Sequence, residues 1–372
     1  MARPETRGRR LAVRLGGVAT SLLAAGLALL LSMAVIAAFG GPPARAAQSL
    51  WTGAFGSTQQ LAGTISYVTP LALVALGWIV VASAGRISVG FDGQILAGGI
   101  LATFVGTSLG GLPTWLHLGL AVAAAVAAGA VWAGIAAWLW AARRVNEIIA
   151  TLLLNFVAAQ IVGWLVRGPL QEPTGGFPQS APLSPSAQWP DLIGNTPLAG
   201  DVFLALALVA VTPLVLRGTG FGYRLRLTGA NDEAARHAGV RTARVTVAAL
   251  LVSGALAGLA GSSLILAGQA GVMTEGFNQN LGFYGIVVAL LARNAAAGVL
   301  PAALLVAALL QGGPYMQAQV GISSALVSLT QGLVVVFVAG AVFLNRRRGG
   351  RGGGLRPEPA ADVDGAQTVE AS

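Results

Sequence analysis

The amino-acid sequence predicts an all-α integral membrane protein, a bundle of about ten transmembrane helices with both termini in the cytoplasm. Of its 372 residues, 55% are hydrophobic and only 9% are charged, whereas a soluble domain carries roughly a quarter charged residues. The hydrophobic residues gather in repeated runs, and a run of about 20 residues crosses a bilayer as a helix. A chain with this composition needs lipid to cover its surface.

Short loops that contain most of the arginine separate the apolar runs. The expected spans are 15–39, 64–84, 88–109, 114–142, 146–166, 201–216, 246–268, 281–293, 297–312 and 322–344. The eighth and ninth are short for a full crossing, which leaves half-helices or one bent hairpin as alternatives. The third begins with the glycine-rich stretch GRISVGFDGQ, which leaves a broken or re-entrant span open. The helices contain two GxxxG pairs, Gly106 with Gly110 and Gly254 with Gly258, which are expected to pack helices closely.

The positions of the arginines predict the orientation of the chain. With the N-terminus in the cytoplasm, every basic residue except Arg45 and Arg167 lies on the cytoplasmic side, as the positive-inside rule requires. An odd number of spans would place the C-terminal arginines outside, so an even number is favoured. The expected regions are a basic cytoplasmic segment 1–14, a transmembrane domain 15–345 with an outer loop 168–200 and a cytoplasmic loop 217–245, and a disordered cytoplasmic tail 346–372.

The first apolar run has an alternative interpretation as a signal peptide. The stretch PARAAQS that follows it resembles a small-residue cleavage site. The run is, however, longer than the roughly 7–15 residues of a signal h-region, so a retained span is favoured.

Missing residue types exclude several functions. The chain has no lysine, which a phosphate-binding P-loop requires, so it is not expected to hold ATP itself. It has no cysteine, which excludes disulfides and thiolate nucleophiles. His117 and His237 have no ligand neighbours at zinc-site spacing, so no metal is expected. The net charge of +9 is spread over short loops instead of one basic face, which argues against nucleic-acid binding.

The most informative segment of the cytoplasmic loop is LTGANDEAARHAGV. Asn231 suits a helix N-cap, and two acidic residues follow it in the first turn. Arg236 and His237 fall in the last turn, and Gly239 suits the left-handed position after a helix. A helix of two turns is unstable alone in water. It must therefore rest on its own bundle or dock into a partner, and the missing ATP site favours a separate ATPase subunit.

These residues resemble a known family. LTGANDEAARHAGV, followed by VSGALAGLAGS, is similar to the cytoplasmic loop and next span of the bacterial ABC-importer permeases that serve simple sugars, branched-chain amino acids and nucleosides. GRISVGFDGQILAGG, VNEIIATLLLNFVA, VRGPL with GFPQSAPL, and GFYGIVVALLARN resemble the nucleoside-type members. The resemblance runs from about Tyr67 to Gly313 and covers most of the chain.

The resemblance implies a non-enzymatic transport subunit of the bacterial plasma (inner) membrane, without a cofactor of its own. It implies cytoplasmic ATP-binding subunits that hold ATP and magnesium, a second permease of the same or a different sequence, and an extracytoplasmic solute-binding lipoprotein. The short cytoplasmic helix would then be the coupling helix. Its expected coupling residues are Gly229, Asn231, Glu233, Ala234, Ala235, Arg236 and Gly239.

Asp92 is the most isolated acidic residue near the membrane interior, and such a carboxylate is by default a functional candidate. Ser88 and Gln94 would join it on a substrate path if the span is broken here. Equally, Asp92 could lie at the cytoplasmic boundary, where it would cap a helix or pair with Arg86. The family usually has Asn and Glu where this chain has Ser88 and Asp92, and it has a proline after the position of Asn294, so the solute is left open.

Two further asparagines complete the candidate path. Asn155 lies on an apolar helix and is expected to face the bundle interior, where a hydrogen bond between helices is the plain alternative. Asn278, with Gln279 and Asn280, precedes the eighth span near the outside, where a solvated loop explains these residues equally well. The expected mechanism is alternating access, with a nucleoside as the first expected solute and a simple sugar as the second.

The sequence supports three other functions less well. An ion-coupled secondary transporter or channel usually buries several ionisable residues, and only Asp92 is a candidate here. A membrane-embedded enzyme would need a nucleophile, a metal or an acid–base pair, which the composition does not offer. An inert scaffold would need neither broken, glycine-rich spans nor a cytoplasmic helix with signals at both ends.

Overall fold

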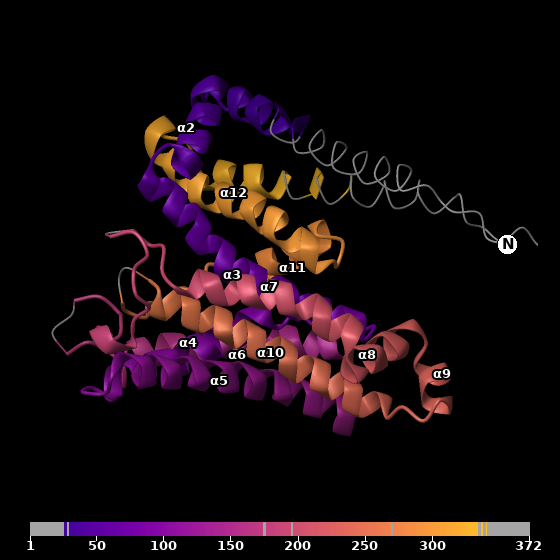
Figure 1. Cartoon of the computed structure of the whole chain (residues 1–372). Helices are drawn as coiled ribbons and strands as arrows, with labels where there is room; N and C mark the ends of the chain where they lie inside the picture. The colour runs from indigo at the N-terminus through magenta and orange to yellow at the C-terminus, as the bar shows by residue number, and fades with distance from the viewer. Residues whose placement is uncertain are drawn as a thin grey trace, which may run out of the picture.

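The computed structural model describes residues 26–27, 30–173, 176–194, 196–268, 271–333, 336–337 and 340. Within these residues the chain is a bundle of helices (Figure 1), and β-pairing is confined to isolated bridges that involve the outer loop. The bundle helices are α3 (Thr58–Ser83), α4 (Phe91–Ser108), α5 (Thr114–Arg143), α6 (Glu147–Val166), α7 (Asp201–Gly218), α10 (Thr242–Leu266), α11 (Leu281–Leu291) and α12 (Val299–Val320).

In this part of the chain, 6 helices are long and apolar enough to cross a membrane: α3, α5, α6, α7, α10, and α12 together with the preceding turn η2 (Ala296–Gly298). The helices α4 and α11 are shorter or less apolar. The first and tenth predicted spans run into residues outside the description, although 30–38 and 324–333 are helical. The all-helical membrane bundle is therefore confirmed. The count of ten and the cytoplasmic termini remain predictions, and segments 1–14 and 346–372 lie outside the described residues.

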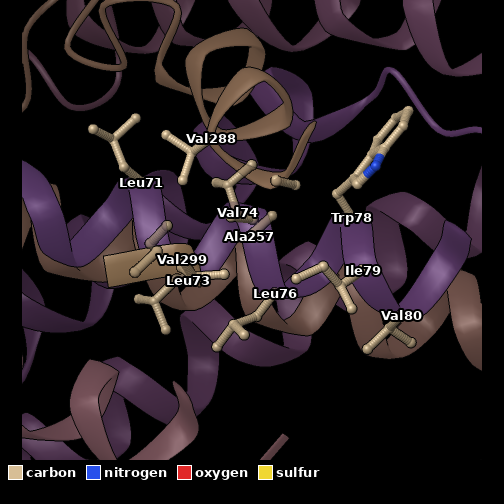
Figure 2. Close-up of a cluster of buried hydrophobic side chains, with 14 of the residues drawn as sticks. Leu71, Leu73, Val74, Leu76, Trp78, Ile79, Val80, Ala257, Val288 and Val299 are labelled. Atoms are coloured by element: carbon tan, nitrogen blue, oxygen red, sulfur yellow. The ribbon is translucent and has the colours of Figure 1, made fainter. Parts of the chain in front are cut away.

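Helix α3 is the centre of the core. Its residues from Leu71 to Leu76 are all buried, whichever way they point around the helix. A helix that is apolar on every side is buried on every side. Figure 2 shows why this holds here, because Ala257 of α10, Val288 of α11 and Val299 of α12 surround α3.

Small residues let α5 and α10 pack backbone to backbone. A Cβ atom at Gly254 would overlap the carbonyl oxygen of Gly129, and one at Gly258 would overlap that of Ala125. The predicted packing role of this GxxxG pair is confirmed. The role predicted for Gly106 and Gly110 is wrong, because α4 ends at Ser108 and Gly110 has no described atom near its Cβ position.

Helix α12 and the segment that packs on it differ from the prediction in two ways. The ninth span was expected at 297–312, but α12 continues to Val320 and is not a half-helix. The polar Gln311 lowers the hydropathy there without ending the helix, because it packs against Gly63 of α3. The sequence also gave no sign of α2 (Pro43–Phe55), an amphipathic helix that packs on α12 and runs across the possible cleavage site PARAAQS.

The two ends of the bundle carry different structures (Figure 1). The loop 168–200, predicted as the outer loop, covers one end and contains η1 (Pro185–Ala187), a 3-10 helix of one turn. At the other end, α8 (Gly220–Ala230) and α9 (Asp232–His237) project from the bundle between α7 and α10. The sequence predicted α9 but not α8, which continues from α7 after a break at Thr219. The two candidate sites lie at this end and in the bundle interior.

Candidate functional site

The predicted cytoplasmic helix is present, with the predicted signals at both ends. The side chain of Asn231 accepts hydrogen bonds from the backbone N–H groups of Glu233 and Ala234, both at 3.0 Å. Arg236 pairs with Asp232 one turn earlier. Gly239 has a φ of +80°, the left-handed conformation that glycine adopts without strain. Local sequence therefore determines both ends of α9.

Helix α9 is anchored to the bundle by small residues. Ala235 is fully buried, whereas Asn231, Glu233, Ala234 and Arg236 are exposed. Just before α9, a Cβ atom at Gly229 would overlap the carbonyl oxygen of Ser83 at the end of α3. The helix therefore rests on its own bundle on one side and leaves a polar surface exposed on the other. Docking of a partner on that surface remains a prediction.

The surface beside α9 is basic. A hollow of about 480 Å³ lies between α9, the end of α5 and the start of α10. Its basic side chains are Arg86, Arg144, Arg236, Arg241 and Arg244. Arg86 lies over the ring of Trp140, at 4.6 Å from its centroid, and pairs with Glu147 at 3.6 Å. The alternative pairing of Arg86 with Asp92 is therefore wrong, because α5 and α6 hold this arginine.

Asp92 lies inside the bundle instead of at its cytoplasmic boundary. It is the second residue of α4 and only 4% exposed. Its Oδ1 accepts hydrogen bonds from the side-chain amide of Asn278 at 2.8 Å and from the backbone N–H of Gly282 at 3.1 Å. The other carboxylate oxygen makes no hydrogen bond with a described residue. Asp92 does cap a helix, but the helix is α11.

The third span begins with a re-entrant segment. The residues 84–90 leave the C-terminal end of α3 and turn back, so that Phe91 packs against Gly77. Gly77 is six residues before the end of α3, about 9 Å along a helix. Non-helical backbone at this depth needs hydrogen-bond partners from the protein. The sequence left this break open, and the structure places it between α3 and α4.

Helix α6 supplies those partners. The hydroxyl of Thr151 accepts from the N–H of Val89 at 3.2 Å. The Asn155 amide accepts from the N–H of Gly93 and donates to the carbonyl of Val89, both at 2.8 Å. Asn155 therefore faces the bundle interior and makes the predicted hydrogen bonds between helices.

A hollow of about 320 Å³ opens beside these contacts, between α4, α6 and the segment that leads into α11. Asp92, Asn155 and Asn278 all line it, so the fold brings together three of the five residues predicted for the substrate path. Ser88 and Gln94 do not line it. Both are buried, with oxygen atoms that have no hydrogen-bond partner among the described residues.

Two polar residues of this hollow were missed by the sequence reasoning. Gln160 lies more than one turn beyond Asn155 on α6, and Glu275 pairs with Arg167, which follows the last residue of α6. Gln160 could have been found by the signal that identified Asn155, a lone polar residue in an apolar helix. Among the described residues, no group of His, Asp and Glu side chains could hold a metal ion.

Residues 60–339 match the family described as the branched-chain amino acid transport system permease component. The chain belongs to this permease family. It is 40% identical to the glucose ABC transporter permease protein TsgB13 of Haloferax volcanii, over 80% of each chain. It is 32% identical to the guanosine ABC transporter permease protein NupP of Bacillus subtilis, over 88% of this chain and 94% of that one. It is 28% identical to the nucleoside ABC transporter permease protein NupB of Lactococcus lactis, over 87% and 90%.

In this permease the first turns of two short helices meet beside a polar hollow. Helix N-termini carry partial positive charge and free N–H groups. Interrupted helices of this kind supply polar backbone groups to substrate sites in transporters. The hollow of about 320 Å³ lies at the lower end of the range of roughly 300–1,000 Å³ for small-molecule sites. The arrangement can bind a small polar solute through hydrogen bonds.

Proposed function

We propose that this permease is the transmembrane subunit of an ATP-driven importer in a bacterial plasma membrane, and that it carries a nucleoside or a simple sugar. The proposal rests on the polar hollow where α4 and α11 begin. Its carboxylate and amide oxygens are acceptors for hydroxyl and N–H groups, which both solute classes carry. The relatives are named as permeases for glucose, guanosine and nucleosides, which fits the same chemistry.

The coupling helix would act on this hollow through a short mechanical path. The ATPase subunit would dock on the exposed side of α9, where the neighbouring arginines attract acidic surfaces. Movement of α8 and α9 would reach Gly85 directly, because Gly229 lies against it. Gly85 belongs to the re-entrant segment 84–90, which leads directly into the first turn of α4, where Asp92 lies. A push from the ATPase would therefore reach the residue that joins α4 and α11, and would alternate access to the hollow.

We further propose that the second permease of the importer is a different chain. Haloferax volcanii, Bacillus subtilis and Lactococcus lactis each have a second related permease, which is 29%, 27% and 25% identical to this chain, respectively. In each organism the first relative is the more similar one. This chain thus resembles one member of a pair of different permeases. We also propose that an extracytoplasmic solute-binding lipoprotein delivers solute to the extracytoplasmic end of the permease.

The test is purification of tagged protein from detergent-solubilised native membranes, with mass spectrometry of the co-purifying chains. We expect a P-loop ATPase, a second permease and a solute-binding protein. The complex is then reconstituted in liposomes, and uptake of guanosine and of glucose is measured with ATP on the ATPase side. Purification of this chain alone, with uptake driven by an ion gradient and not by ATP, would replace the importer with a secondary transporter.

A further inference from the structure

Gln160 is exposed on the surface of α6, on a side where its neighbours are apolar. It is the fourteenth of the 20 residues of α6, well inside a predicted membrane span. It makes no hydrogen bond with another described residue. Its neighbours on the same side are Phe156, one turn before it, and Trp164, one turn after it, which are 64% and 65% exposed. The three side chains form one stripe, because residues four apart share a helix face.

Contact of this stripe with lipid is energetically unfavourable because of Gln160. A side-chain amide placed in hydrocarbon without a hydrogen-bond partner costs several kcal/mol, on the order of 2–7. Phe156 and Trp164 tolerate lipid, but Gln160 does not. Its surface must therefore meet water or a polar partner at this depth.

The position of Gln160 shows where that water would lie. Gln160 and Phe156 line the polar hollow that contains Asp92 and Asn278. They also line a second hollow of about 400 Å³, whose other residues are Val157, Ile161 and Trp164. Gln160 therefore lies at the boundary between the polar hollow and the second hollow, which is lined by aromatic and aliphatic side chains.

We infer that Phe156, Gln160 and Trp164 bind the base of a nucleoside as it passes through the permease. This inference rests on the proposed function and narrows its two solute classes to one. An amide offers a donor and an acceptor side by side, which matches the edge of a purine. Exposed aromatic rings on either side give the flat face of the base a surface to stack on. The sugar hydroxyls would then reach the carboxylate and amides of the polar hollow.

Cysteine accessibility tests the inference directly, because the chain has no native cysteine. The variant Gln160→Cys is made in the complete reconstituted importer and exposed to a charged, water-soluble methanethiosulfonate reagent. The matched control is Val211→Cys on α7, a residue that is 44% exposed and lies near the middle of its span. A thiol in lipid does not ionise and reacts slowly. We expect labelling of Gln160→Cys to be at least about tenfold faster than labelling of the control, and we expect guanosine, but not glucose, to slow it.

A second variant measures the contribution of the amide to transport. Gln160→Leu keeps the size of the side chain and should fold, since the position is exposed. Loss of one or two hydrogen bonds should raise the KM for guanosine about tenfold with little change in kcat, and Gln160→Asn should restore part of the affinity.

Three outcomes would overturn the inference. Labelling as slow as that of Val211→Cys would mean that Gln160 is shielded from water, by lipid or by a neighbouring chain, and does not line the solute path. Fast labelling that guanosine does not slow would mean that the residue meets water but not the base. ATP-driven uptake of glucose and of no nucleoside by the unmodified importer would reject the base-binding role, while the proposed importer would stand.

Discussion

The carboxylate of Asp92 accepts a hydrogen bond from the backbone N–H of Gly282 at 3.1 Å, across 190 residues of sequence. Asp92 is in the first turn of α4, and Gly282 is in the first turn of α11. One buried acid thus joins the starts of two short helices. The side chain of Asn278 strengthens the same junction at 2.8 Å.

Removal of this carboxylate should damage both stability and transport. Asp92→Ala would leave the N–H of Gly282 and the amide of Asn278 unpaired in a buried place, at a cost of roughly 1–3 kcal/mol. Asp92→Asn keeps an oxygen acceptor and should lose less. The measurements are thermal unfolding in detergent and ATP-driven uptake. If Asp92→Ala had the same unfolding temperature and the same uptake rate as the unmodified protein, the junction would contribute neither to stability nor to transport.

A methyl group at Gly282 should break the same junction from the other side. Its Cβ atom would overlap the backbone and carboxyl group of Asp92, both of which are held in the packed core. Gly282→Ala should therefore be destabilising by about 1–3 kcal/mol, as overpacking usually is. Gly119→Ala on α5 is the control, because that position has no described atom within 4 Å and alanine favours helices. Equal unfolding temperatures for the two variants would contradict the prediction.

Coupling should depend on the close approach of α8 to the end of α3. A Cβ atom at Gly229 would overlap the Ser83 carbonyl oxygen. Gly229→Ala should push the two segments apart, so that uptake falls at least about tenfold while ATP hydrolysis by the complex continues. Gly218→Ala, at an open position at the end of α7, is the matched control. Uptake that falls equally in both variants would point to a general loss of folding instead.

The outward side of α9 should determine ATPase binding. Glu233 is exposed, so Glu233→Trp should block a docking surface without disturbing the bundle. We expect loss of the co-purifying ATPase, and the same from a bulky residue at Arg236. Asn231→Ala separates folding from docking, because it removes only the cap and should destabilise α9 by about 1 kcal/mol. The coupling role fails if Glu233→Trp retains both ATPase and uptake.

His117 should hold the outer loop against the bundle. One ring nitrogen lies 2.8 Å from the Ser186 hydroxyl, and the other lies 3.0 Å from the carbonyl oxygen of Val105. The Val105 oxygen can only accept, so its partner nitrogen carries hydrogen. His117→Leu should free the loop 168–200, which then becomes sensitive to proteases added outside. Ser186→Ala loses one of the two contacts and should show a smaller effect, and identical digestion of all three proteins would refute the tie.

Local patterns in the sequence were sufficient for much of this protein. The apolar runs predicted α5 at 114–142, and it spans Thr114–Arg143. The ends of α9 were predicted from Asn231 and Gly239, because caps act within one turn. Polar residues inside apolar runs correctly marked Asp92 and Asn155 as unusual. They did not predict which groups these side chains would meet.

The sequence by itself determined that the chain is a helical membrane protein, where most helices lie, and that a capped helix projects from the bundle. These properties follow from composition and from neighbours within a few residues. Only the tertiary structure decided that Asp92 caps α11 instead of pairing with Arg86, that Ser88 and Gln94 are outside the hollow, and that Gln160 is on its wall. Contacts across 190 residues depend on the depth at which each helix begins, and that depth is set by the packing of all the helices together.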